Sequence, residues 1–198
     1  SKKNSNVNLE NGFKNHKDLS NIFFNFKKKL DTLKKKSYLV AVSGGPDSLA
    51  LASLTKFYNY TTKSKFYYVL INHNIRKKSL KEAMQVKNLL KKHKITLNVI
   101  SNKKKITKNI QGEARNVRYE MLLKYCKKKN IGTILTAHNL EDQVETFFIR
   151  LSRGSGLAGL SAMKSLRKLD KNIMLYRPLL DIKKKFLIKI SKKIFGKY

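Results

Sequence analysis

Cysteine, proline and acidic side chains are scarce in this chain. Its 198 residues include one cysteine, Cys126, two prolines and no tryptophan. A single cysteine excludes a disulfide framework, a CxxC redox pair and a thiolate metal cluster within these residues, and it favours a reducing compartment. No apolar run is long enough to cross a membrane, and the polar first residues do not resemble a signal peptide. We therefore expect a cytoplasmic protein with no membrane partner.

The scarcity of acidic residues leaves the chain strongly basic. Twelve aspartates and glutamates stand against 45 lysines and arginines, and the formal net charge is +33. Such a field attracts polyanions, so RNA or DNA is the expected partner. Because 38 of the basic residues are lysine, a coding bias toward lysine and asparagine is an alternative explanation. The seven arginines are better indicators, since a guanidinium group can bind phosphate through two parallel hydrogen bonds.

The most informative segment is Ser43-Gly44-Gly45-Pro46-Asp47-Ser48. It follows an apolar run at 38–42 and precedes a helix-like apolar pattern at 49–58, so a buried strand, a glycine turn and a helix are expected. This geometry directs backbone N–H groups and a helix N-terminus at one point, which suits a phosphate group. The carboxylate of Asp47 would repel that phosphate unless a Mg²⁺ ion bridged the two.

This segment differs from the Walker P-loop. Leu49-Ala50-Leu51 stands where that motif has Gly-Lys-Ser/Thr. A proline–aspartate turn that merely caps a helix is the alternative interpretation. The position of all six residues between a strand and a helix favours phosphate binding.

Apolar runs and helical patterns alternate along most of the chain, after a polar segment at 1–15 that we expect to be loose. Strands are predicted at 38–43, 66–72, 95–100, 131–136 and 173–176, and helices at 18–33, 47–59, 79–93, 112–129, 140–152 and 181–194. The alternation predicts an α/β fold, a doubly wound parallel five-stranded sheet in the order 3-2-1-4-5 with helices on both faces. Ligands bind such sheets where the strand order reverses, so residues 43–48 should face residues 137–139.

A second group of polar residues lies at 137–146. Three of the twelve acidic residues fall here, Glu141, Asp142 and Glu145, and their spacing places carboxylates on one face of a helix. An N-cap at Asn139 with Asp142 at the third helical position would explain the first two acids, but hardly Glu145. A carboxylate pocket in a basic protein favours a cationic ligand, either an amine or a metal ion.

Other candidate residues follow strands or begin helices. His138 stands at the expected reversal point, although an ordinary strand-end histidine is the simpler alternative. The remaining candidates are His73 and Arg76 after the second strand, Arg115 and Arg118 one helical turn apart, and Arg177 after the last strand. Each arginine could be an ordinary surface residue, but these positions fit contacts with phosphate groups.

A glycine-rich segment at 153–159 contains a formal G-x-G-x-x-G pattern. The pattern follows a helix rather than a strand, so the context required for dinucleotide binding is missing. We expect a loop here, lying over the crevice.

These motifs together resemble the N-type ATP pyrophosphatase (PP-loop) superfamily and, within it, the tRNA(Ile)-lysidine synthetase family. The resemblance runs from about Tyr38 to the end of the chain. The motifs that carry it are Ser43–Ser48, His73–Arg76, 109–119, 137–146, 153–160 and Arg177-Pro178-Leu179-Leu180. It implies an adenine nucleotide alpha hydrolase-like fold and a PP-loop catalytic domain over residues 16–198, without the family's C-terminal tRNA-binding domains.

The resemblance implies a reaction and its substrates. ATP would adenylate the ring carbonyl oxygen of the wobble cytidine in an isoleucine tRNA with a CAU anticodon. The amine of free L-lysine would then displace AMP and leave lysidine. The implied partners are therefore that tRNA and lysine, with ATP and Mg²⁺ as cosubstrate and cofactor, and a homodimer is compatible with the resemblance.

The resemblance also implies a role for each motif. Asp47 would hold Mg²⁺, Asp142 and Glu145 would bind the lysine ammonium group, and the catalytic residues would be Asp47, His138 and Arg177. The ATP-binding residues would be Ser43, Gly44, Gly45, Pro46, Asp47, Ser48, His73, Arg76, Arg115 and Arg118.

The chain departs from the family in three respects. Glu141 stands where the family commonly has aspartate, Asn74 stands where it has glycine, and the chain is shorter than most members. Two alternatives stay open. One is another PP-loop tRNA-modifying ATPase such as a thiolase, although sulfur carriers need paired cysteines, and the other is a non-catalytic basic RNA-binding domain.

Overall fold

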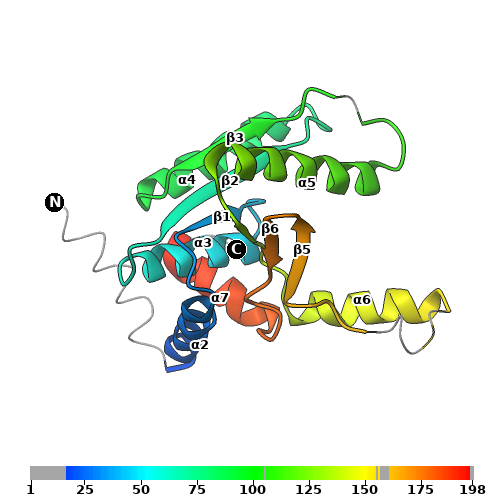
Figure 1. Cartoon of the computed structure of the whole chain (residues 1–198). Helices are drawn as coiled ribbons and strands as arrows, with labels where there is room; N and C mark the ends of the chain where they lie inside the picture. The colour runs from blue at the N-terminus through cyan, green and yellow to red at the C-terminus, as the bar shows by residue number, and fades with distance from the viewer. Residues whose placement is uncertain (1–16, 105, 155, 157–160, 197–198) are drawn as a thin grey trace.

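A six-stranded sheet in the order β3-β2-β1-β4-β6-β5 forms the centre of the computed structural model, which describes residues 17–196 apart from 105, 155 and 157–160 (Figure 1). Five neighbouring strands, β3, β2, β1, β4 and β6, pair in parallel. The edge strand β5 runs antiparallel to β6. The strands are β1 Ser37–Ala41, β2 Lys65–Asn72, β3 Leu97–Ser101, β4 Thr133–Leu135, β5 Leu166–Asp170 and β6 Ile173–Tyr176. The predicted parallel order and α/β class are confirmed.

The predicted count of five strands is wrong, because β5 was missed. Its sequence is Leu-Arg-Lys-Leu-Asp, and its first three residues are exposed, so it carries no apolar run that would predict a strand. Charged residues suit an edge strand, since they discourage pairing with a further chain. A charged edge strand is therefore hard to recognise from hydrophobicity alone.

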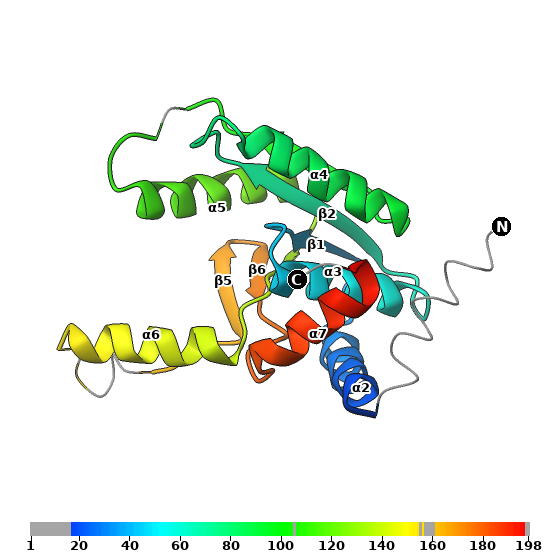
Figure 2. The same cartoon turned by 180° about the vertical axis from the view of Figure 1, so that it is seen from behind.

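Helices cover both faces of the sheet (Figures 1 and 2). Residues of α2, α3, α4 and α7 share one buried apolar cluster with the sheet, while α5 packs on the opposite face. α6 projects from the body on the β5–β6 side and buries none of its residues. The helices are α2 Lys17–Leu33, α3 Pro46–Asn59, α4 Ser79–Lys92, α5 Ile110–Lys129, α6 Leu140–Ser152 and α7 Lys184–Phe195.

The central strand β1 shows why both faces must be covered. Its consecutive residues Leu39 and Val40 are fully buried on opposite faces, Leu39 in the α5 cluster and Val40 in the α3 cluster. Side chains alternate along a strand, so a continuous apolar run needs packing on both sides. This requirement is met by helices on each face of β1.

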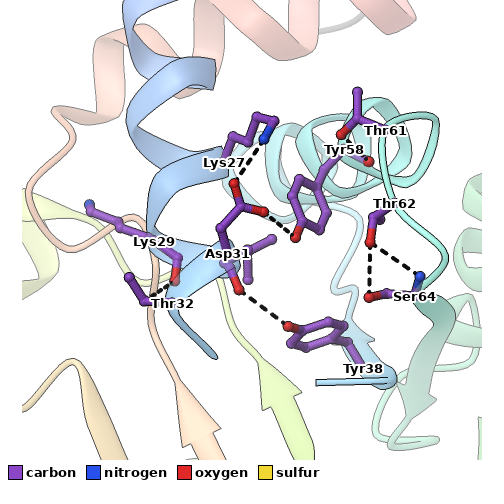
Figure 3. Close-up of polar contacts among 10 residues, drawn as sticks. Lys27, Lys29, Asp31, Thr32, Tyr38, Tyr58, Thr61, Thr62 and Ser64 are labelled. Carbon is purple, nitrogen blue, oxygen red and sulfur yellow. Dashed lines mark hydrogen bonds and ion pairs between the residues drawn. The ribbon is translucent and has the colours of Figure 1, made fainter. Parts of the chain in front are cut away.

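Polar contacts fasten α2 to α3 at the edge of the sheet where the parallel strands begin (Figure 3). The carboxylate of Asp31 accepts hydrogen bonds from Lys27 at 2.8 Å and from the Tyr58 hydroxyl at 2.7 Å. The Tyr38 hydroxyl donates to the carbonyl of Leu30 at 3.5 Å. The hydrogen bonds from Lys27 and Tyr58 hold the pKa of Asp31 below its usual value, so this carboxylate stays charged and engaged.

Two sequence predictions fall on segments that the structure does not describe. The loose segment at 1–15 lies outside the described residues, and so does most of the loop at 153–159. No described helix is both long enough and apolar enough to span a membrane.

Replacing Phe26 by alanine should destabilise the fold, whereas replacing Phe24 should not. Phe26 is fully buried between α2 and the core, and Phe24 on the same helix is 66% exposed. Truncating a buried phenylalanine to alanine lowers the free energy of unfolding by about 3–5 kcal/mol, while a substitution at an exposed site changes it by about 0.5 kcal/mol or less. Urea unfolding of the two variants tests this, and equal midpoints would show that α2 is not part of the cooperative core.

Candidate active site

Three neighbouring cavities form a trough at the edge of the sheet where the parallel strands end. The central cavity measures about 430 Å³ and lies between the loop after β1 and the loop after β4. Ser43 and His73 join it to a cavity of about 190 Å³ beside α4. His138 and Asp142 join it to a cavity of about 830 Å³ beside α6 and β5. The predicted meeting of residues 43–48 with residues 137–139 therefore occurs in this fold.

The glycine loop is held in a defined shape before α3 begins. Gly44 has a φ of +92°, and a Cβ atom there would lie 2.6 Å from Cγ2 of Val86. The Ser48 hydroxyl accepts a hydrogen bond from the Gly44 backbone N–H at 3.0 Å and donates to the Gly45 carbonyl at 2.9 Å. Pro46 opens the helix, where its missing N–H has no cost. The loop thus places the N-terminus of α3 against the central cavity.

Asp47 lies in the first turn of α3 and faces the central cavity. One of its carboxylate oxygens, Oδ1, is buried and has no hydrogen-bond partner among the described residues. Burial raises the pKa of Asp47, the charge of Lys184 opposes that shift, and the charges of Asp142 and Glu141 add to it. A buried, unpaired carboxylate oxygen near other carboxylates fits a cationic partner.

The described residues contain no cluster of three metal-binding side chains. An ion here would therefore take one or two carboxylates from the protein and its other ligands from phosphate and water. Mg²⁺ binds in this manner at many phosphate-transferring sites. The residues present thus fit magnesium better than a metal that needs a complete protein cage.

His138 lines both the central cavity and the cavity beside α6. Its Nδ1 lies 3.0 Å from the hydroxyl oxygen of Thr136, which fixes the orientation of the ring. Burial, and then the positive charge of Arg177, lower the pKa of His138 to about 4. The ring is therefore neutral near pH 7, so it can donate or accept hydrogen bonds without repelling a cationic substrate.

The acidic start of α6 divides into structural and unassigned groups. Asn139 and Asp142 form a capping box. The Asn139 side chain accepts from the backbone N–H of Asp142 at 3.1 Å, and the Asp142 carboxylate accepts from the backbone N–H of Asn139 at 2.9 Å. The carboxylate of Glu141 accepts from the backbone N–H of Lys184 at 2.8 Å and joins the start of α6 to that of α7. Glu145 lines the cavity beside α6 and has no hydrogen bond or ion pair with the described residues. The capping box thus accounts for Asp142 and the bond to α7 accounts for Glu141, which leaves Glu145 without a structural role.

All seven arginines of the chain line one of the three cavities. Arg76 lies in the small cavity, where it pairs with Glu82 at 2.9 Å, and Arg118 lines the central one. Arg177 is 4% exposed and donates to the carbonyl of Lys164 at 2.7 Å. The cavity beside α6 is lined by Arg115, Arg150, Arg153, Arg167 and Arg177.

The sequence analysis assigned no site role to three of these arginines, Arg150, Arg153 and Arg167. Arg150 follows Asp142 and Thr146 at intervals of four, so the helical face that carries the acid could have revealed it. Arg167 lies in β5, the strand that was not predicted, so no pattern in the sequence pointed to it.

The turn after β2 contains an asparagine, Asn74, with a positive φ. Asn74 has a φ of +55°, a conformation that asparagine tolerates better than most residues. Its side chain accepts from Asn72 at 2.7 Å and donates to the carbonyl of Asn102 at 2.7 Å. Both ring nitrogens of the preceding His73 are buried without a partner among the described residues, and burial lowers its pKa. The turn therefore keeps its shape and presents an unsatisfied imidazole to the trough.

The sequence matches the PP-loop domain family over residues 18–196. The chain is 42% identical over 153 residues to the tRNA(Ile)-lysidine synthase of Orientia tsutsugamushi, covering 76% of this chain and 34% of that protein. It is 40% identical over 158 residues to that of Wolbachia pipientis wMel, covering 77% and 36%. It is 37% identical over 156 residues to the chloroplastic tRNA(Ile)-lysidine synthase of Gracilaria tenuistipitata var. liui, covering 76% of this chain and 47% of that protein. The chain thus spans a third to a half of the length of these relatives.

Solved structures share the fold at low sequence identity. The U34-tRNA thiolase NcsA of Methanococcus maripaludis, solved with its [4Fe-4S] cluster, superposes with a TM-score of 0.75 at 17% identity, covering 91% of this chain and 65% of that one. The NH3-dependent NAD synthetase of Campylobacter jejuni gives a TM-score of 0.52 at 16% identity, covering 87% and 70%. These likenesses support the fold and carry no assignment of substrate.

Replacing Gly44 by alanine should disturb the glycine loop, and replacing Gly45 should not. A Cβ atom at Gly44 would clash with Val86 at a positive φ, whereas at Gly45 the nearest atom, Oγ of Ser43, lies 3.8 Å away. We expect a loss of about 1–3 kcal/mol of stability for Gly44→Ala, measured by urea unfolding. Adding Val86→Ala should restore only part of the lost stability, because it removes the clash but leaves the backbone strain at a positive φ. Equal stabilities for the Gly44 and Gly45 variants would contradict this description of the loop.

Proposed function

The chain belongs to the PP-loop domain family, and from this membership we propose that it joins lysine to the wobble cytidine of an isoleucine tRNA with a CAU anticodon. ATP would supply the energy, leaving AMP and pyrophosphate. The resemblance to tRNA(Ile)-lysidine synthases stated from the motifs is confirmed by identities of 37–42%.

The observation that supports this proposal most strongly is the chemical difference between the central cavity and the cavity beside α6. The central cavity carries the glycine loop and the N-terminus of α3, which suit phosphates. The cavity beside α6 carries Glu145 among five arginines and Lys164, so it offers sites for an amine and for RNA phosphates together. His138 and Asp142 line both cavities, so substrates in the two would meet there.

ATP would occupy the central cavity, with its phosphates along residues 43–48. Arg118 would lie close to the nucleotide, because it lines the same cavity. Asp47 would hold Mg²⁺, and the ion when bound would offset negative charge on the phosphates. The buried Oδ1 of Asp47 gains a partner in this arrangement.

Lysine and the target base would occupy the cavity beside α6. The carboxylates of Asp142 and Glu145 would bind the ammonium group of lysine through charge-assisted hydrogen bonds. The arginines would hold the anticodon loop by its phosphates. The cytidine has to leave its stack, which costs a few kcal/mol and least in a single-stranded loop.

The proposed reaction has two steps. The carbonyl oxygen of the cytosine ring attacks the α-phosphorus of ATP, and the bond from that phosphorus to pyrophosphate breaks. The amine of lysine then attacks the ring carbon that carries this oxygen and loses a proton. The bond from that carbon to the oxygen breaks, and AMP departs with the former carbonyl oxygen. Arg177 lines the cavity beside α6 and its charge acts on His138, which lines both cavities, so Arg177 would face the charge that develops on the α-phosphate where the cavities meet. Neutral His138 would orient the reacting groups by hydrogen bonding.

A sulfur-transferring activity has less support in these residues. Cys126 is the only cysteine of the chain, it is buried, and burial raises the pKa of its thiol to about 12. A thiol in this state is a poor nucleophile and a poor metal ligand at neutral pH. The 198 residues thus lack the paired cysteines that a sulfur carrier needs.

Release of pyrophosphate and AMP should require ATP, lysine and the tRNA together, and Asp47→Ala should reduce the rate about 100-fold or more. The reason is the loss of the group that would hold Mg²⁺ against the phosphates. A radiolabelled ATP assay with each substrate omitted in turn measures this. AMP formation that ignores lysine would indicate another PP-loop tRNA-modifying ATPase. RNA binding without any turnover would indicate a non-catalytic basic RNA-binding domain.

Glu145→Gln should raise the KM for lysine about 10-fold or more without changing the KM for ATP. A hydrogen bond to a charged group contributes about 1.5–3 kcal/mol, and the glutamine keeps the shape while losing the charge. Glu141→Gln is the matched control on the same helix, because the Glu141 carboxylate bonds α7 and lines none of the three cavities. An equal lysine dependence in both variants would refute the role of Glu145.

A further inference from the structure

A second basic surface lies at the opposite edge of the sheet, where β1 and β2 begin. A pocket of about 790 Å³ opens there between the C-terminal ends of α2, α3 and α5. It contains no arginine, in contrast to the trough, and it is lined by the lysines Lys34, Lys35, Lys36, Lys63, Lys65 and Lys129. All six of these lysines are exposed.

The positive charge of this pocket is not neutralised by neighbouring acids. Six lysines against one aspartate, Asp31, leave it with five net positive charges. Figure 3 shows that the Asp31 carboxylate is already engaged by Lys27 and by the Tyr58 hydroxyl, at 2.8 and 2.7 Å. None of the six lysine amines forms an ion pair with a residue that the structure describes. The pocket therefore presents free ammonium groups to solvent.

Helix ends account for part of this pattern. Three helices terminate at the pocket, and lysines after a C-terminus stabilise the helix dipole. Each helix end carries about half a negative charge, so three ends offset less than a third of the five positive charges. The remaining charge is available to an external anion.

The basic surface is elongated rather than confined to a single point. A second pocket of about 370 Å³ continues along α2, sharing Asp31 and Lys34 with the first and adding Lys27 and Lys28. Phe24, which is 66% exposed, also lines it and offers an apolar face to a base. We call the two pockets together the lysine groove. Its length suits a linear polyanion better than a single small anion.

We propose that the lysine groove binds the phosphate backbone of RNA, as a second contact surface remote from the trough. The choice of RNA rests on the proposed function, whose substrate is a tRNA. β2 has eight residues and spans about 26 Å from the groove to the trough, so one nucleotide cannot reach both and an extended RNA can. Lysine ammonium groups act as point charges, so the groove contributes affinity and position rather than sequence recognition.

The test compares two variants that lose the same number of charges. The groove variant carries Lys36→Gln, Lys63→Gln, Lys65→Gln and Lys129→Gln, and the control carries Lys81→Gln, Lys91→Gln, Lys92→Gln and Lys192→Gln. The control lysines are exposed and line none of the five cavities described above. Binding of an isoleucine tRNA transcript to the full chain is measured across a series of KCl concentrations. Circular dichroism and urea unfolding verify that both variants keep the parent fold.

For the groove variant we expect the slope of log K against log salt to become shallower by about two to three, since each phosphate contact contributes about 0.9. The control should keep the parent slope. ATP binding and turnover at saturating tRNA should be unchanged in both, while the KM for tRNA rises only in the groove variant. Equal slopes for the two variants would overturn the proposal.

Two further outcomes separate this inference from its alternatives. If the groove variant loses binding to vesicles that contain phosphatidylglycerol but binds RNA like the control, the groove faces a membrane and the proposal fails. If the parent chain forms no lysidine yet the groove variant shows the shallower slope, the proposed function fails and the RNA groove stands.

Discussion

The pairing of β1 with both β2 and β4 is the constraint on which the site depends. Leu39 of β1 lies opposite Tyr67 of β2 on one side and Ile134 of β4 on the other. The chain order reverses at this point, because the connections from β1 lead away in opposite directions along the sheet. The chain therefore leaves the neighbouring ends of β1 and β4 in opposite directions, and a cavity remains between the two loops. Asp47 and His138, about ninety residues apart, therefore line the same 430 Å³ space.

The fully buried core around β1 keeps this arrangement rigid. Leu39 and Val40 have no exposed surface, and neither do Leu49 and Leu51 in the helix that follows the glycine loop. Burial of such side chains is worth about 1.5–3 kcal/mol each, so the loop between them is anchored at both ends. A rigid frame is what an anion site needs, because backbone N–H groups must be aligned before the ligand arrives. The packing of the core thus holds the glycine loop in the shape that the proposed phosphate site requires.

The sequence predicts the elements of this fold well where apolar residues mark them. β1, α3 and the acidic start of α6 were all located from patterns, and the parallel order followed from the alternation of strands and helices. The missed strand, β5, is charged and half exposed, and with it Arg167 was lost from the site. The bond of Glu141 to the start of α7 joins residues more than forty positions apart, and no local pattern encodes such a contact. Local chemistry was therefore predictable, and the contacts between distant segments were not.

Unsatisfied polar atoms gather at the trough rather than being spread through the core. Of the seven buried side-chain atoms without a partner among the described residues, four belong to Asp47, His73 and Arg177, which line the three cavities. Each such atom costs about 1–3 kcal/mol while it lacks a hydrogen bond. A fold under selection for stability alone would not concentrate this cost in one place. A ligand with phosphate oxygens would restore partners to the guanidinium group and, through a bound cation, to the Asp47 carboxylate. A bound ligand would recover part of this cost as binding free energy, so the position of these atoms supports the proposal that substrates bind in the trough.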